Sequence, residues 1–246
     1  MNHADEAAKN LNPTRRTLLA GLSAAAVSPW VFAHSPDDKP ATGKAKSAHA
    51  AFDALMAGNN RFAHGKLTLQ EDLAAARRDL VSGQSPFAIV LACSDSRVPV
   101  ETVFDQGLGD VFVVRVAGNL VSTDVLGSIE YAALHLHSPM IFVLGHQKCG
   151  AVTAALAAKE GKLNEPPHIT ELVGLITPGL TGLNMQQAPD ALLEAAVEAN
   201  VHYTLDQLRR APEISRMLDK KTLGIAGGVY HLASGEVSIL DKSVPA

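Results

Sequence analysis

The chain contains little cysteine and few aromatic residues. Its 246 residues include only two cysteines, Cys93 and Cys149. Aromatic residues make up 4% of the sequence, and its single tryptophan, Trp30, lies close to the N-terminus. We therefore expect a folded domain without tryptophan, although the 47% share of hydrophobic residues is enough for a packed core.

The sequence also lacks a dense cluster of lysine and arginine. It has 21 basic residues against 25 acidic ones, which gives a net charge of −4 at pH 7. Without a basic patch, nucleic acid is not an expected partner. Residues 48–246 show no internal repeat or low-complexity segment, and their number fits a single α/β domain.

The N-terminus is typical of an export signal. Arg15 and Arg16 precede an apolar run over residues 18–27, which is too short to span a bilayer comfortably. A small-x-small pattern ends at Ala33, and residues 24–26 are a weaker cleavage site. This segment has no cysteine, so a lipid anchor is not expected.

We predict a twin-arginine signal peptide over residues 1–33, a flexible tether over 34–47 and one domain over 48–246. The protein would then be periplasmic or otherwise exported by the twin-arginine route, with no membrane association once the leader is removed. The alternative is a cytosolic protein with an amphipathic N-terminal arm.

Apolar runs alternate with helical patterns along the centre of the chain. Continuous apolar runs predict strands that are covered on both faces, as in parallel sheets. The fold class is therefore α/β, with a mainly parallel central sheet flanked by helices. The region 161–189, rich in proline and glycine, is expected to be mostly loop. Expected strands cover residues 87–92, 111–116, 140–145, 222–231 and 237–240, and expected helices cover 48–62, 69–80, 124–137, 150–159 and 189–210.

Each cysteine belongs to a short motif that directly follows an expected strand. Cys93 opens the sequence CSDSR, and Cys149 closes HQKC, which begins at His146. The carboxyl ends of parallel strands are where open α/β sheets place ligands. Two thiolates and an imidazole suit zinc and leave a fourth position for water or a carboxylate, as in catalytic zinc sites. Buried, chemically inert cysteines or a disulfide are the alternatives.

Together these motifs resemble those of β-class carbonic anhydrases. The resemblance runs from about residue 48 to 240 and includes QSP at 84–86, VVRVAGN at 113–119, SIEYA at 128–132 and GHQKCG at 145–150. It implies a β-carbonic-anhydrase-like fold whose N-terminal helices pack on a partner subunit. It also implies a homodimer or a higher even homo-oligomer.

The resemblance implies one Zn²⁺ per chain, held by Cys93, His146 and Cys149. The reaction would be the reversible hydration of carbon dioxide to bicarbonate and a proton by a zinc-bound hydroxide. Asp95 and Arg97 would form a charge-assisted pair that orients the hydroxide and keeps Asp95 off the zinc. If that pair breaks, Asp95 could become the fourth ligand of a closed site. An ordinary surface ion pair is the alternative.

The resemblance also assigns residues to the substrate pocket. Gln84 matches a substrate-facing glutamine, while Phe112, Ala117 and Tyr131 match positions that line an apolar pocket, partly supplied by the partner subunit. Gly150 would let the backbone approach the pocket closely. Taken singly, Phe112 and Tyr131 are more typical of core residues than of site residues.

Two other functions stay open from the sequence. The same zinc site could hydrolyse a related small molecule, such as carbon disulfide or carbonyl sulfide, because access to the metal rather than its ligands would decide the substrate. Alternatively, Cys93 and Cys149 could serve a non-catalytic zinc-binding or thiol-sensing protein. Pure metal storage does not need an open, oriented fourth position, so the Asp95–Arg97 pair argues against it.

Overall fold

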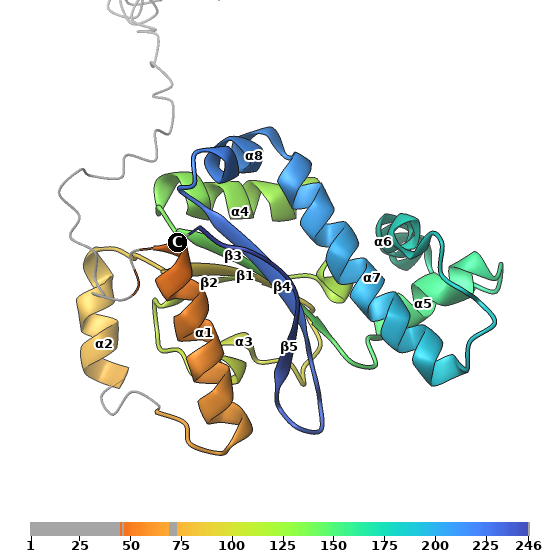
Figure 1. Cartoon of the computed structure of the whole chain (residues 1–246), viewed down its shortest axis with the longest axis horizontal. Helices are drawn as coiled ribbons and strands as arrows, with labels where there is room; N and C mark the ends of the chain where they lie inside the picture. Colours follow the sequence, from red (N-terminus) through yellow and green to blue (C-terminus); the bar gives the residue numbers. More distant parts are fainter. Residues whose placement is uncertain (1–44, 46, 69–72, 246) are drawn as a thin grey trace, which may run out of the picture. The chain divides into compact units, whose positions relative to one another are not determined.

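A five-stranded sheet with the strand order β2-β1-β3-β4-β5 forms the centre of the computed structural model (Figure 1). The structure describes residues 45, 47–68 and 73–245. Strands β1 to β4 are parallel and β5 pairs antiparallel with β4, which confirms the mainly parallel α/β fold. The strands are β1 (Ala88–Ala92), β2 (Val111–Arg115), β3 (Met140–His146), β4 (Gly224–Tyr230) and β5 (Val237–Ser243).

Helices cover both faces of this sheet and connect its parallel strands. The α-helices are α1 (Ala48–Ala63), α2 (Leu73–Asp79), α3 (Val100–Val103), α4 (Thr123–His135), α5 (Gly150–Lys159), α6 (Pro167–Ile176), α7 (Pro189–Arg210) and α8 (Pro212–Asp219). Short 3-10 helices are η2 (Leu80–Ser82), η3 (Ala117–Asn119) and η4 (Thr177–Leu180).

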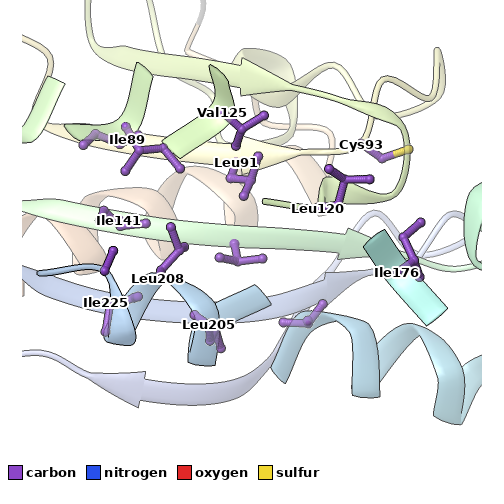
Figure 2. Packing of buried hydrophobic residues seen from close by; sticks show 14 of the residues in the cluster. Ile89, Leu91, Cys93, Leu120, Val125, Ile141, Ile176, Leu205, Leu208 and Ile225 are labelled. Atoms are coloured by element: carbon purple, nitrogen blue, oxygen red, sulfur yellow. The ribbon is translucent and has the colours of Figure 1, made fainter. Parts of the chain in front are cut away.

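The central strands bury side chains on both faces because successive residues of a strand point to opposite sides. Ile89 and Leu91 of β1 belong to a core cluster shared with α4 to α8, part of which Figure 2 shows. Val90 of β1 and Phe142 of β3 instead join a second cluster with α1 and α3. Every residue of β1 and β3 is buried, which explains their uninterrupted apolar runs.

Helix α7 packs against β3 and β4 at positions where the strands carry glycine. A Cβ atom on Gly145 would lie 2.5 Å from Val201 Cγ2, and one on Gly227 would lie 2.9 Å from Leu205 Cδ1. Neither position has room for a larger side chain without movement of the helix. Since Gly145 precedes His146, the close contact also brings α7 next to the strand end that carries the predicted histidine ligand.

The prediction that residues 161–189 form mostly loop is wrong. This region contains the ten-residue helix α6 and the 3-10 helix η4. Pro167 occupies the first turn of α6, where proline is well tolerated. Val173 and Ile176 then bury one side of the helix. The proline and glycine content concealed this apolar spacing.

Described residues just before position 48 contact the rest of the domain. The Ser47 side chain caps α1 by accepting a hydrogen bond from the Ala50 N–H at 3.2 Å, and Ala45 packs against the second core cluster. The predicted leader, most of the predicted tether and residues 69–72 of a predicted helix lie outside the described residues. Among the described helices, none is long and apolar enough to cross a bilayer.

Candidate metal centre

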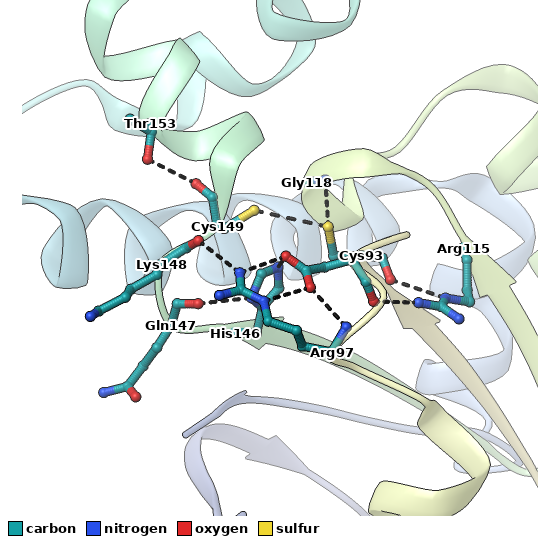
Figure 3. A network of polar contacts seen from close by, with 10 residues as sticks. Cys93, Arg97, Arg115, Gly118, His146, Gln147, Lys148, Cys149 and Thr153 are labelled. Atoms are coloured by element: carbon teal, nitrogen blue, oxygen red, sulfur yellow. Dashed lines mark hydrogen bonds and ion pairs between the residues drawn. The ribbon is translucent and has the colours of Figure 1, made fainter. Parts of the chain in front are cut away.

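Three predicted ligands meet at the carboxyl edge of the sheet. Cys93 directly follows β1, His146 is the last residue of β3, and Cys149 precedes α5 (Figure 3). Because β1 and β3 are parallel neighbours, their carboxyl ends lie side by side. The two Sγ atoms are 4.0 Å apart, and all three potential ligand atoms lie within 4.8 Å of one another. All three side chains are buried.

The donor atoms fit a zinc ion. The Nδ1 atom of His146 lies 2.8 Å from the Gln147 carbonyl oxygen, an acceptor that places the proton on Nδ1 and leaves a lone pair on Nε2. That buried Nε2 has no hydrogen-bond partner among the described residues. A tetrahedral zinc with two thiolate ligands requires a sulfur separation of about 3.8 Å, close to the spacing found between Cys93 and Cys149.

The two thiols differ in acidity because they share one buried site. A hydrogen bond with Cys149, helped by the Gly118 N–H, lowers the pKa of Cys93. The same hydrogen bond, with burial and the negative charge on Cys93, raises the pKa of Cys149. Without a cation the pair thus favours one thiolate, and a metal ion would compensate the second negative charge.

Asp95 and Arg97 form the predicted pair beside the ligands. Arg97 Nε donates to Asp95 Oδ1 at 2.9 Å, and a terminal nitrogen donates to Oδ2 at 2.7 Å. These hydrogen bonds from Arg97 hold the pKa of Asp95 well below its usual range. Asp95 Oδ2 also lies 3.8 Å from His146 Nε2. The carboxylate is therefore next to the ligand atoms while both of its oxygens are held by Arg97.

Arg115 is a further part of this site that the sequence reasoning did not single out. Its guanidinium donates to the carbonyl oxygens of Cys93 at 3.1 Å and Asp95 at 2.7 Å. Arg115 ends β2 and is in register with Ala92, so its side chain reaches the loop after β1. In the sequence, Arg115 could be recognised only as a single charged residue at the end of an apolar run.

The turn after β2 supplies a hydrogen bond to a ligand. Gly118 donates its N–H to Cys93 Sγ at 3.3 Å (Figure 3). Its φ of +77° is a conformation that favours glycine, and a Cβ there would clash with Ile176 Cδ1. Ala117 is half-buried in the same turn, so this predicted pocket residue lies beside the metal ligands.

Three other predicted pocket residues lie away from this chain's own ligands. Gln84 is exposed and precedes β1, while Phe112 pairs in register with Ile89 near the start of that strand. The Phe112 and Tyr131 rings are neighbours, with centroids 6.4 Å apart. At a rise of about 3.3 Å per residue, Ile89 is separated from Cys93 by most of the length of β1.

Gly150 is adjacent to a ligand, but no close approach within the chain requires glycine there. It is exposed, and a Cβ at this position would meet no other atom within 4 Å. The expected reason for a glycine at this point is therefore not found among the described residues.

A mainly parallel α/β sheet with a buried Cys-His-Cys group at its carboxyl edge defines a protein with a catalytic type of metal centre. The family model for carbonic anhydrase matches residues 88–237. A carbonic anhydrase of Mycolicibacterium smegmatis is 40% identical over 191 residues, covering 77% of this chain and 92% of that protein. Carbonic anhydrase 2 of Mycobacterium tuberculosis is 39% identical over 193 residues, covering 78% and 92%.

Solved structures of β-carbonic anhydrases share the fold. The enzyme CafA of Aspergillus fumigatus has a TM-score of 0.64 at 26% identity and covers 79% of this chain and 92% of its own. One of two tetrameric β-carbonic anhydrases of Sordaria macrospora has a TM-score of 0.64 at 24% identity, with coverage of 80% and 98%. The chain belongs to the carbonic anhydrase family, in its β class.

Family membership decides between the functions that the sequence left open. The residues matched by the family model include all three ligands, so the cofactor is zinc, as predicted. The most similar relatives described above are named carbonic anhydrases. Neither hydrolysis of carbon disulfide or carbonyl sulfide nor a non-catalytic zinc-binding role is favoured.

Proposed function

We propose that the protein catalyses the reversible hydration of carbon dioxide to bicarbonate and a proton. The observation that carries this proposal is the buried group of Cys93, His146 and Cys149 in a carbonic anhydrase fold. The His146 Nε2 atom in this group has no hydrogen-bond partner in the part of the chain that the structure describes. When bound there, zinc supplies the Lewis acidity that turns water into a nucleophile near neutral pH.

Asp95 and Arg97 would keep the fourth metal position open and oriented. Both Asp95 oxygens accept hydrogen bonds from Arg97, which would restrain the carboxylate from moving towards the ligand atoms. Arg97 also donates to the Lys148 carbonyl oxygen at 3.3 Å, so the pair connects both ligand motifs. An intact pair leaves Asp95 available to accept a hydrogen bond from the nucleophile; a broken pair would let Asp95 close the site.

The assembly we propose is a homodimer or a higher even oligomer in which a partner completes the pocket. Gln84, Phe112 and Tyr131 lie towards the amino end of β1, away from their own chain's ligands, and Gln84 is exposed. β2 is an edge strand whose side chains are at most half-buried, which leaves it available to a second copy. The fold relative from Sordaria macrospora is tetrameric.

Mixed oligomers test this arrangement. A Cys149→Ser chain lacks a metal ligand and a Gln84→Ala chain lacks the glutamine, so each alone should be nearly inactive. If a partner supplies Gln84, co-assembly of the two chains should restore about a quarter of the activity, because half of the dimers are mixed and each has one complete site. No recovery in verified mixed oligomers would contradict the proposal.

We further propose that the protein is exported, with a leader over residues 1–33, a tether over 34–47 and the enzyme domain over 48–246. The adjacent Arg15 and Arg16 ahead of an apolar run support this proposal. Replacing both arginines by lysine should retain the protein in the cytoplasm, whereas Lys9→Arg should not. Unchanged fractionation of the double variant would contradict export by this route.

Metal removal tests the proposed reaction directly. Dialysis against a zinc chelator should abolish carbon dioxide hydration, and one equivalent of zinc per chain should restore it. Activity that persists in protein shown to be free of metal would contradict the proposed function.

A further inference from the structure

Helix α7 contacts the turn that hydrogen-bonds to the first metal ligand. The buried side chain of Asn200 donates from Nδ2 to the Gly118 carbonyl oxygen at 2.8 Å. One helical turn further on, the Thr204 hydroxyl donates to the Asn119 carbonyl oxygen at 3.2 Å. Two side chains on one face of α7 thus hold two successive carbonyl groups of η3.

The turn needs such support because its backbone is in an uncommon conformation. Gly118 has a φ of +77° and Asn119 has a φ of +42°, both in the left-handed region. The beginning of the turn is fixed to the sheet, where Val116 donates its N–H to the Ala92 carbonyl oxygen at 3.1 Å. At the other end of the turn, the hydrogen bonds from Asn200 and Thr204 fix the backbone. Together these contacts set the direction of the Gly118 N–H.

The same face of α7 is fixed against the strand that carries the second ligand. Val201 lies between Asn200 and Thr204 in sequence and packs against Gly145, one residue before His146. Helix α7 therefore contacts both the turn that hydrogen-bonds to Cys93 and the strand that presents His146.

We propose that Asn200 is a positioning residue for the metal centre. It holds the turn at residues 116–119 so that the Gly118 N–H points at the Cys93 thiolate, and Thr204 assists it. Asn200 touches neither the metal ligands nor the substrate, and it acts through the Gly118 peptide groups. The inference rests on the proposed function in that Cys93 is taken to bind zinc.

The hydrogen bond from the Gly118 N–H changes how much electron density the Cys93 thiolate donates to the metal. An N–H donor stabilises the sulfur lone pairs, and such outer contacts orient ligands and tune the metal they hold. Loss of the Asn200 side chain would free the turn, weaken the Gly118 hydrogen bond and leave the Cys93 thiolate less well placed.

The experiment compares Asn200→Ala with the parent protein in two metal-bound forms. Chelator competition should show zinc affinity reduced by about 10-fold, the lower end of the range for outer-contact losses. In the cobalt-substituted protein, the sulfur-to-cobalt charge-transfer band should move to longer wavelength, because a thiolate without its hydrogen bond is a better electron donor. Thr204→Val should shift both quantities in the same direction by a smaller amount.

Asn59→Ala is the matched control. Asn59 is also buried, and its side chain donates to the carbonyl oxygens of Val103 at 3.1 Å and Gly235 at 2.8 Å, none of them at the metal centre. This variant should lose stability while its zinc affinity and cobalt spectrum stay at the parent values.

If Asn200→Ala, Thr204→Val and the parent protein have equal cobalt spectra and zinc affinities, the inference is overturned. An equal shift of both quantities in Asn59→Ala would also overturn it. If Asn200→Ala does not fold, the spectrum of Thr204→Val decides in the same way. A parent protein whose cobalt form has no thiolate charge-transfer band would instead overturn the metal site itself, and with it the proposed function.

Discussion

At the scale of single residues, hydrogen bonds to His146 and Cys93 prepare these two side chains to bind a metal. The Gln147 carbonyl fixes the proton of His146 on Nδ1, so Nε2 faces the two sulfur atoms with a free lone pair. Gly118 does the equivalent for Cys93 by donating to its sulfur. The residue type indicates a possible metal ligand, and a hydrogen bond to a neighbouring backbone group orients the side chain for that role.

Arg97 provides the first prediction. Arg97→Ala should reduce carbon dioxide hydration by about 100-fold or more while zinc stays bound, because Asp95 loses the partner that keeps it off the metal. Stopped-flow rates and zinc content per chain measure the two effects. Arg209→Ala, which removes a partly exposed ion pair with Asp241, should leave both unchanged. Full activity in Arg97→Ala would refute the proposed switch.

Asp105 provides a prediction about stability and pH. Burial alone would raise the pKa of Asp105, but hydrogen bonds from Arg61 and Thr68 outweigh it and lower the pKa. A lowered folded-state pKa gives stability that is present above the unfolded pKa and is lost as the pH falls through the folded value. Asp105→Asn should therefore cost about 1–3 kcal/mol of unfolding free energy at neutral pH.

The difference between the Asp105→Asn variant and its parent should shrink as the pH falls below about 4, where the unfolded carboxyl binds its proton. Urea unfolding of both proteins across this range measures it. A difference that stays constant at all pH values would show that the ionised form of Asp105 contributes nothing.

The three metal ligands and the Asp95–Arg97 pair could be predicted from the sequence because their chemistry is local. Each motif spans a few residues and follows an apolar run that could be recognised as a strand. The contacts of Arg115, Gly118 and Asn200 could not be found in this way, because they join residues separated by 20 to 82 positions. Such contacts exist only once the sheet has brought the strand ends and α7 together.

At the scale of elements, the turn η3 is the piece of backbone on which the site most depends. Gly118→Ala should lower the free energy of unfolding by about 1–3 kcal/mol, because its backbone is left-handed and its Cβ would clash with Ile176. Zinc affinity should fall as well, since the Gly118 N–H would move away from Cys93. Denaturant unfolding and chelator competition measure the two effects.

Gly174→Ala is the control for the turn. Gly174 lies within α6, where a Cβ would meet no atom within 4 Å, so alanine should stabilise that helix by up to about 1 kcal/mol. Its zinc affinity should equal that of the parent protein. A Gly118→Ala variant that matched Gly174→Ala in both measurements would contradict the role given to η3.

Strand positions were easier to predict than connections. Strands β1 and β3 are buried on both faces, so their apolar runs were unambiguous. In α6, proline and glycine suggested a loop, but Pro167 begins the helix and Val173 and Ile176 bury one side of it against the core. Tertiary packing overrode local composition there, and composition alone could not reveal it.

At the scale of the whole molecule, we propose that one chain holds the metal ligands but not a complete pocket. Gln84, Phe112 and Tyr131 could be assigned to the pocket only through the resemblance, since a single sequence contains no distances between subunits. Their place towards the amino end of β1 is consistent with sites shared between copies. The pocket is then a property of the assembly, and dissociation should inactivate the enzyme.

The donor set of the intact enzyme predicts its pH dependence. Two thiolates cancel the formal charge of zinc, so water should be acidified less than at a site with three neutral histidines, where its pKa is about 7. Hydration should therefore be faster at about pH 8.5 than at about pH 7. A rate that stays flat over this interval in stopped-flow assays would contradict the charge argument.

The central claim is that Cys93, His146 and Cys149 hold the zinc that hydrates carbon dioxide. Its most direct test is stopped-flow hydration by the zinc-loaded protein beside a Cys149→Ser variant of equal folded content. We expect rapid turnover in the parent protein, and loss of both zinc and turnover in the variant. Absence of turnover in a parent protein that carries one zinc per chain, or full activity in the variant, would contradict it.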